Sequence, residues 1–422
     1  MTAPGSPVKR SKGQGRVSAR AGAFLPLLIV VVGFLALACN GGDPLVDDDG
    51  VNGVAPPDDD EIPDVTVPPG ATLNDVPRRT DVSQSLTGAG ATFPNVLYST
   101  WVDEYSRLNS GIRVNYQSIG SGGGIRAVVD RTVDFGGTDG PMTEDQKEDA
   151  SARVWHIPTA MGAVVPAYNL EEAPDELRFS QDTIAGIFLG HIDRWDDPAI
   201  AADNPGADLP DQDIAVCHRS DGAGTTFIWV DFLAEISDEW AEDIGVATSV
   251  SWPRGNFVGG NGNEGVAQCI QQIDGALGYV EIAYAETNNL PVAQLENAAG
   301  NFVEPTLGAV TEAAGGMIEA GEFPDDMEAR VANAPGEGSW PASGFTWLLV
   351  YEELAILDGM SLTRAQELIR FMLWALDEDG GQQYTEPLDY APIHPDVRDL
   401  AHEAITGITY HGQPVWETML EQ

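Results

Sequence analysis

The chain from Ser85 onward alternates strand-like and helix-like segments. Apolar residues recur every three or four positions over 97–108, which predicts a helix, and every second position over 112–116, which predicts a strand. Repeated strand-loop-helix units imply parallel strands with right-handed crossovers. The sequence therefore predicts an α/β fold whose loops lie at the carboxyl ends of neighbouring strands, where open α/β sheets bind ligands. The first three such loops are residues 88–94, 120–124 and 136–141.

Strand-like and helix-like segments also alternate in the second half of the chain. A strand over 214–217 leads into a loop over 218–226 and then a helix over 227–233, and another strand is expected over 276–280. No internal repeat of the kind that builds solenoids is present.

Two helices are predicted near the C-terminus. The first is expected over residues 345–357, which are mostly apolar. The second is capped by Ser361 and stopped by Gly380-Gly381.

Residues 1–38 contain five cations, no acid and an apolar run that ends before Cys39. A run of about 16 apolar residues is short for a membrane span of about 20, and the arrangement fits an export signal. The ending Leu-Ala-Leu-Ala-Cys39 resembles a lipobox, with Ala36 where that motif prefers Leu. We therefore expect cleavage before Cys39 and lipid attachment to it. No Arg-Arg pair precedes the run, which favours the general secretory route.

Residues 39–84 are rich in acids, proline and glycine and contain no aromatic residue. Such a segment cannot bury enough apolar surface to offset the entropy lost on ordering, so we expect a disordered acidic tether. Its runs of three aspartates lack the spacing of a calcium-binding loop.

Acids greatly outnumber cations: 66 Asp and Glu against 21 Lys and Arg give a net charge of −45. This balance argues against a protein that binds the phosphate backbone of nucleic acids, which needs a basic face. A hydrophobic content of 43% still allows a folded core. Self-repulsion of this size is largely screened in molar salt, where the screening length falls to about 3 Å. The sequence therefore predicts a halophilic protein with an acidic surface.

Cys217 and Cys269 are the two cysteines beyond Cys39. Their even number permits one disulfide in an exported chain. Both lie in apolar contexts, which fits two buried thiols almost as well. The sequence leaves the two alternatives open.

The loops do not match common catalytic or cofactor motifs. Phe93 stands where a dinucleotide fingerprint needs its third glycine, and no apolar strand precedes the similar stretch 260–265. The six histidines show no metal-binding spacing. His218 beside Ser220 and Asp221 suggests a hydrolase, but neighbours on one loop rarely face one another. We therefore expect no cofactor, no metal and no catalytic residue.

Hydroxyl-bearing residues stand at the starts of three predicted helices. Thr92, Ser121 and Thr225 each lie close to glycines that let a ligand approach the backbone. Free N–H groups at helix starts attract anions. Each residue alone is more often a simple N-cap. The three together with Arg219, whose guanidinium can hold an oxyanion by two N–H bonds, favour an anion site.

Several segments resemble the ligand loops of the phosphate-binding proteins of ABC transporters. The resemblance covers the chain from about Ser85 to its end and implies a two-lobed, type II periplasmic-binding-protein fold of α/β class. Each lobe would be a mostly parallel sheet flanked by helices, and the lobes would be hinged around a cleft that closes on one phosphate. Lobe 1 would comprise residues 85–165 and 285–422, and lobe 2 residues 166–284. The matching segments are 88–94, 115–125, 132–139, 195–200, 218–227 and 275–281.

The resemblance carries ligand roles to eight positions. Asp139 would accept a hydrogen from monobasic or dibasic phosphate, which fully ionised sulfate cannot offer; taken alone, it would be a turn residue before Gly140-Pro141. Ala223 stands where the family usually has Ser, so one hydroxyl donor is missing. The eight positions are Thr92, Phe93 through its backbone N–H, Ser121, Asp139, Arg219, Asp221 as a brace for Arg219, Gly224 and Thr225.

The resemblance implies a monomeric receptor that binds inorganic phosphate and passes it to the permease subunits of an ABC transporter. With the signal and lipobox, we expect a lipoprotein at the cell surface or in the periplasm. One alternative is a sensor or scavenger of phosphate or another oxyanion that is not coupled to transport. A phosphoester hydrolase is a weaker alternative.

The charge balance generates a first prediction. We expect the melting temperature of the purified protein to rise between dilute and molar potassium chloride, because salt screens the repulsion among its acids. Calorimetric melts across a salt series would measure this. A melting temperature that stays constant or falls would contradict the proposed adaptation to salt.

Overall fold

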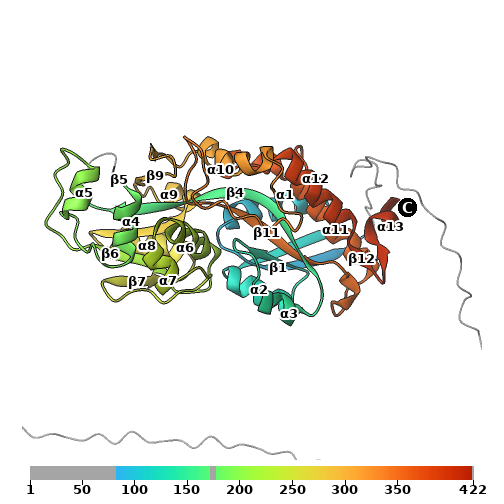
Figure 1. Ribbon diagram of the computed structural model, residues 1–422. Coiled ribbons are helices and arrows are strands. Elements are labelled where there is room, and N and C mark those ends of the chain that lie inside the picture. The colour runs from blue at the N-terminus through green and yellow to red at the C-terminus, as the bar shows by residue number, and fades with distance from the viewer. Residues whose placement is uncertain (1–81, 172–176, 421–422) are drawn as a thin grey trace, which may run out of the picture. The chain divides into compact units, whose positions relative to one another are not determined.

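Figure 1 shows a computed structural model of the chain, which describes residues 82–171 and 177–420. The predicted signal peptide, Cys39 and nearly all of the predicted tether lie outside the described residues. Strand β1 begins at Gln84, the last residue assigned to that tether. None of the helices in the described ranges is long and apolar enough to cross a membrane.

An eight-stranded sheet with the order β2-β1-β3-β11-β4-β8-β6-β7 runs through the structure. Its strands are β1 (Gln84–Gly90), β2 (Ile112–Ser118), β3 (Phe135–Thr138), β4 (Val154–Asn169), β6 (Ala215–Arg219), β7 (Phe257–Gly260), β8 (Ala276–Glu281) and β11 (Ser343–Tyr351). Two small sheets contain β5 (Arg178–Phe179), β9 (Gln294–Glu296) and β10 (Phe302–Val303), and β12 (Thr409–Tyr410) and β13 (Gln413–Pro414).

Helices pack against these strands. Near the N-terminal strands, α2 lies against β1 and β3, and α11 also covers β1, whereas α8 packs against β6, β7 and β8. The α-helices are α1 (Asn95–Leu108), α2 (Ser121–Val129), α3 (Glu144–Ala150), α4 (Gln181–Phe188), α5 (Pro198–Asp203), α6 (Gly224–Ile236), α7 (Asp238–Asp243), α8 (Gly262–Gln272), α9 (Ile282–Thr287), α10 (Leu307–Glu319), α11 (Leu362–Leu376), α12 (Pro395–Thr406) and α13 (Val415–Leu420).

Strand β4 joins two groups of parallel strands. In one group β1 pairs in parallel with β2 and β3, and in the other β6 pairs in parallel with β7 and β8. Residues 154–163 of β4 pair with antiparallel β11, and residues 164–169 pair with antiparallel β8. Figure 1 shows β4 running from one group to the other. The predicted two-lobed α/β fold is therefore confirmed, with antiparallel strands at the junction.

The helix predicted from the Ser361 cap is confirmed as α11. The Ser361 hydroxyl accepts a hydrogen bond from the Arg364 backbone N–H at 3.2 Å, which satisfies one of the free donors of the first turn. At the other end the Gly381 N–H donates to the Trp374 carbonyl at 2.7 Å. The helix ends at Leu376, shortly before the two glycines that were predicted to stop it.

The helix predicted over 345–357 is wrong. Residues 343–351 form strand β11, and only a 3-10 turn (Leu354–Ile356) follows. All nine residues of β11 are buried, so the strand lacks the polar-apolar alternation that marks a half-exposed strand. Its pairing with β3 and β4 decides the conformation, and those partners are distant in the sequence.

Cys217 of β6 and Cys269 of α8 form a disulfide with a Cα–Cα distance of 6.1 Å. The bond fastens helix α8 to the strand that ends at Arg219. Of the two alternatives left by the sequence, the structure has the disulfide.

Candidate functional site

The predicted ligand residues lie at the carboxyl ends of parallel strands, in the loops that follow them or in the first turns of the next helices. These loops belong to both groups of strands and meet one another through the hydrogen bonds described below. Thr92 and Phe93 follow β1, Ser121 follows β2, Asp139 follows β3, Arg219 ends β6, and Asp221, Gly224 and Thr225 follow β6.

Two glycine-rich loops touch backbone to backbone where the groups meet. The Gly122 N–H donates to the Gly222 carbonyl at 2.9 Å. A Cβ on Gly122 would lie 3.2 Å from the Gly222 Cα. Gly120 has φ +83, and a Cβ there would lie 2.6 Å from Asp221 Oδ2. Side chains at these glycines would hold the two loops apart.

Ser121 links two other predicted residues. Its hydroxyl donates to Asp139 Oδ2 at 3.1 Å and accepts from the Gly224 backbone N–H at 3.0 Å. It also accepts from the Asp139 backbone N–H at 3.1 Å. Ser121 and Asp139 are almost completely buried. The structure thus brings together three residues that are up to 103 positions apart in the sequence.

Asp139 lies in an environment that disfavours its charge. Burial raises the pKa of Asp139 to about 7, against an ordinary value of 3.8. Hydrogen bonds from Thr346, whose hydroxyl lies 2.7 Å from Oδ1, and from Ser121, together with the charge of Arg219, oppose this rise. The Asp139 carboxyl is therefore close to the point at which it gains or loses a proton near neutral pH.

The Arg219 side chain is only 1% exposed and is held by Asp221. Its Nε donates to Asp221 Oδ1 at 2.8 Å and one terminal nitrogen donates to Oδ2 at 2.5 Å. The other terminal nitrogen donates to the Thr225 hydroxyl at 3.2 Å. Burial alone would raise the pKa of Asp221, but the hydrogen bonds and charge of Arg219 outweigh it and hold the pKa below its usual range. These two bonds to Asp221 have the geometry expected of a carboxylate that holds the Arg219 guanidinium in place.

Asn263, at the start of α8, was missed by the sequence reasoning. Its amide nitrogen donates to Thr92 Oγ1 at 3.0 Å and to Thr225 Oγ1 at 3.1 Å. It lies in the glycine-rich stretch 260–265. The expectation that no strand precedes this stretch is wrong, because β7 leads directly into it. The signal that could have found it is the position of this stretch directly after β7, at the same edge as the other loops.

Two buried tyrosines hold the loop after β1. The Tyr284 hydroxyl donates to the Thr92 carbonyl at 2.7 Å, and the Tyr390 hydroxyl donates to the Phe93 carbonyl at 2.7 Å. In a trans peptide the N–H points opposite to the C=O. The bond from Tyr284 therefore directs the Phe93 N–H away from Tyr284. Neither tyrosine was predicted as part of the site.

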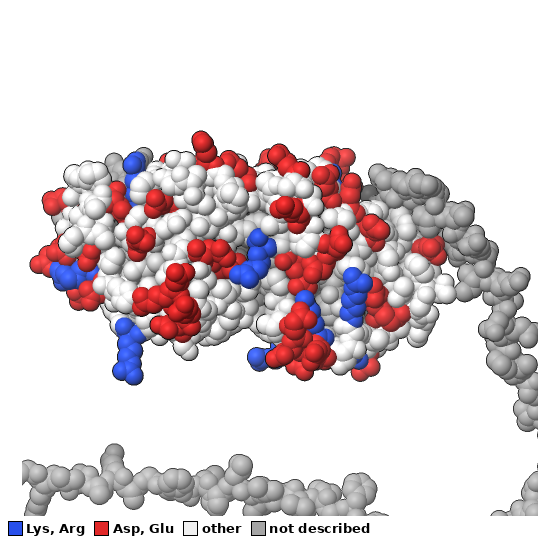
Figure 2. Space-filling model, in the orientation of Figure 1, with Lys and Arg blue, Asp and Glu red and all other residues white. Residues whose placement is uncertain are grey.

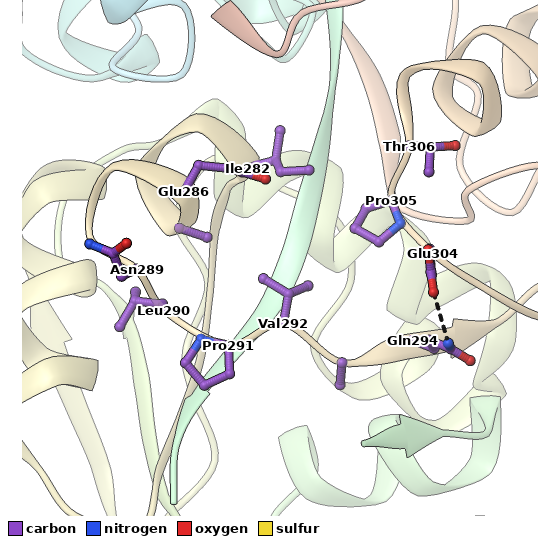
Figure 3. A pocket seen from close by; sticks show the side chains of 12 residues that line it. Ile282, Glu286, Asn289, Leu290, Pro291, Val292, Gln294, Glu304, Pro305 and Thr306 are labelled. Atoms are coloured by element: carbon purple, nitrogen blue, oxygen red, sulfur yellow. Dashed lines mark hydrogen bonds between the residues drawn. The ribbon is translucent and has the colours of Figure 1, made fainter. Parts of the chain in front are cut away.

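A cavity lies apart from these loops (Figure 3). It has a volume of about 670 Å³ and is lined by α9, the chain from Asn289 to Gln294, and Glu304 to Thr306. None of the eight predicted ligand residues lines it.

Comparisons with known proteins place this chain in a family. Residues 75–378 match the model of a PBP superfamily domain. The phosphate-binding protein PstS of Pasteurella multocida is 40% identical over 319 residues, which cover 75% of this chain and 89% of that protein. PstS of Methanocaldococcus jannaschii is 35% identical over 336 residues, which cover 76% of this chain and 85% of that protein.

The chain belongs to the PstS family of phosphate-binding proteins.

Solved structures agree with the PstS fold. A high-affinity periplasmic phosphate-binding protein (PfluDING) bound with phosphate has a TM-score of 0.62 at 19% identity, and the match covers 80% of this chain and 98% of that one. A phosphate-binding protein from Stenotrophomonas maltophilia has a TM-score of 0.60 at 19% identity, with coverages of 80% and 98%. At these identities the likeness concerns the fold.

Two residues of the hydrolase alternative have other partners in this PstS-family chain. His218 Nδ1 lies 2.8 Å from the Arg219 carbonyl, and its ring packs on Trp252 at 4.8 Å between centroids. Asp221 pairs with Arg219. In the part of the chain that the structure describes, no three His, Cys, Asp or Glu side chains gather in a way that could hold a metal ion.

The environment of Asp139 generates a prediction for the ligand-free protein. Between pH 4 and 7 the carboxyl ionises in the unfolded chain but keeps its proton in the folded one, so rising pH favours unfolding. Relative to Asp139→Asn, which cannot ionise, the native chain should lose up to about 4 kcal/mol of stability over this range and nothing further above it. Denaturant unfolding at fixed salt, in phosphate-free buffer from pH 4 to 8, would measure it.

Burial also raises the pKa of Glu281, and the charge of Asp139 adds to this rise. Glu281 is present in both proteins, so only the part of its titration that depends on Asp139 enters the difference. Asp130→Asn, which removes an exposed carboxyl at the end of α2, is the matched control. If the stability difference between Asp139→Asn and the native chain were constant over the whole pH range, the neutral carboxyl would be disproved.

Proposed function

We propose that this protein binds inorganic phosphate outside the membrane and delivers it to the permease of an ABC transporter. The observation that carries the proposal is the convergence of Arg219, three hydroxyls, helix-start N–H groups and one carboxyl outside the Arg219–Asp221 pair, that of Asp139, from the four loops after β1, β2, β3 and β6. This is a donor-rich set with a single acceptor, and it fits an oxyanion that still carries a hydrogen. The names of the PstS relatives support the same ligand.

Phosphate would replace bonds that the site residues now make with each other. The Ser121 hydroxyl and the Gly224 N–H, which pair at 3.0 Å, would each turn to a phosphate oxygen. Arg219 uses three of its five N–H bonds on Asp221 and Thr225, which leaves two for the anion. The hydroxyls of Thr92 and Thr225 and the N–H of Phe93 would complete the set.

Asp139 would provide selectivity. Above its raised pKa of about 7 the Asp139 carboxyl is ionised and can accept the hydrogen of monobasic or dibasic phosphate, whereas with sulfate two acceptors would face each other. The hydrogen bonds from Thr346 and Ser121 hold the carboxyl in place. A mismatch at a buried polar site rejects close analogues strongly.

Binding would involve closure of two lobes. We assign lobe 1 to residues 85–165 and 285–422 and lobe 2 to residues 166–284. β4 changes its pairing partner at Val164, opposite Glu281 of β8, so these two strands would form the connection on which the lobes hinge. The contact between Gly122 and Gly222 would then belong to the closed state.

The location of the protein outside the membrane is proposed from its sequence. We infer that residues 1–38 are removed on export, that Cys39 carries lipid and that the acidic segment up to residue 84 tethers a monomeric receptor to the membrane. Figure 2 shows Asp and Glu spread over the visible face, with few Lys and Arg among them. Such a surface suits concentrated salt.

Titration calorimetry in molar chloride at pH 8, where Asp139 is mostly ionised, tests the proposal. We expect saturable, one-to-one phosphate binding, with sulfate weaker by about 100-fold or more. Asp139→Asn should reduce the ratio of phosphate affinity to sulfate affinity by about tenfold or more, because it removes the acceptor that repels sulfate. Asp130→Asn should leave this ratio unchanged. Absence of phosphate binding by the native chain would refute the function.

Ala223 offers a second test of the site. It is the buried N-cap of α6 and makes no side-chain cap bond. A serine there would add one donor, so Ala223→Ser should tighten phosphate binding by about 1–3 kcal/mol. If the serine hydroxyl capped α6 instead, the melting temperature of the ligand-free protein would rise and the affinity for phosphate would stay unchanged. Calorimetric titrations and ligand-free melts distinguish these two outcomes. An unchanged affinity would contradict the proposal that the site lacks one hydroxyl donor at Ala223.

A further inference from the structure

The amide of Asn263 connects loops from both groups of strands. Its side chain is fully buried, and its two N–H hydrogens have two acceptors, the hydroxyl oxygens of Thr92 and Thr225. Thr92 follows β1, whereas Thr225 follows β6. Each amide hydrogen is therefore used in a bond to a residue of a different loop.

The orientation of this amide is fixed by a backbone group. The Glu281 N–H points at Asn263 Oδ1 at 3.2 Å. A backbone N–H can only donate, so the oxygen of the amide must face Glu281 and the nitrogen must face the two threonines. The reversed amide would bring two donors together at a buried position.

This orientation decides how the two hydroxyls can act. A hydroxyl has one hydrogen and two lone pairs. Thr225 Oγ1 accepts from Arg219 at 3.2 Å and from Asn263 at 3.1 Å, so both lone pairs are used and its hydrogen remains to be donated. Thr92 Oγ1 likewise accepts from Asn263 at 3.0 Å. Thr225 can therefore only donate, and Thr92 keeps its hydrogen for donation with one lone pair left over. Donation is the role that an anion requires of both hydroxyls.

We propose that Asn263 is a positioning residue that fixes the hydroxyls of Thr92 and Thr225 as donors to the bound anion and couples the two loops that carry them. This inference rests on the proposed phosphate site and adds a residue to it. Because Ala223 supplies no hydroxyl, the direction of the remaining hydroxyls matters more here than in a site with a serine at that position.

The first experiment compares Asn263→Asp and Asn263→Ala with the native chain, by calorimetric phosphate titration in molar chloride. A carboxylate only accepts, so in Asn263→Asp both hydroxyls turn toward it, and we expect affinity to fall by about 100-fold or more. Asn263→Ala adds no charge and should lose about tenfold or more. Asn261→Asp is the matched control: it puts the same charge at the same helix start, at an exposed side chain, and should change affinity less than about threefold.

The second experiment separates positioning from a structural role. If Asn263 acts through the hydroxyls, Asn263→Ala should cost less affinity in a Thr225→Val background than in the native chain, because only the Thr92 hydroxyl is then left for Asn263 to position. A merely structural role predicts the same loss in both backgrounds. Ligand-free melts of each variant report any effect on folding.

The outcomes distinguish this inference from the proposed function. If the native chain binds phosphate and Asn263→Ala binds it equally well, or if its loss is the same in both backgrounds, the role of Asn263 is disproved and the phosphate site stands. If the native chain does not bind phosphate, the proposed function itself fails.

Discussion

The site depends on one constraint: polar groups that are buried away from water must form hydrogen bonds with one another or with the backbone. Ser121, Asp139, Arg219, Thr225 and Asn263 are almost fully buried, and an unpartnered polar atom at such a position costs about 1–3 kcal/mol. Each of these side chains bonds to another member of the group or to backbone. The loops that carry them come from distant parts of the chain, so satisfying these atoms fixes how the loops meet.

Charge enters this network in two different ways. The buried charge of Arg219 is paired with Asp221, whereas Asp139 is driven toward neutrality by burial. On a chain with a net charge of −45, long-range attraction cannot recruit an anion, because the summed field opposes its approach. Affinity for phosphate would therefore have to come from directed hydrogen bonds and one guanidinium over short distances.

Local sequence was enough for much of the fold and for the positions of the loops that carry the candidate site. Glycines and hydroxyls after short apolar runs indicated the loops of Thr92, Ser121 and Thr225, because loop position follows from local pattern. The strand β11 escaped prediction because a strand buried on both faces has no alternation. Asn263 and Tyr284 escaped because their roles depend on partners 171 and 192 positions away. Nothing in their neighbouring residues records those contacts.

The bond between Cys217 and Cys269 spans 52 positions and fastens β6 to α8. Arg219 lies two residues beyond one cysteine and Asn263 six residues before the other. The guanidinium and the amide that meet at the Thr225 hydroxyl are therefore preorganised by a covalent link. The entropy of ordering them relative to one another is lost when the protein folds and oxidises, so it does not weaken ligand capture later.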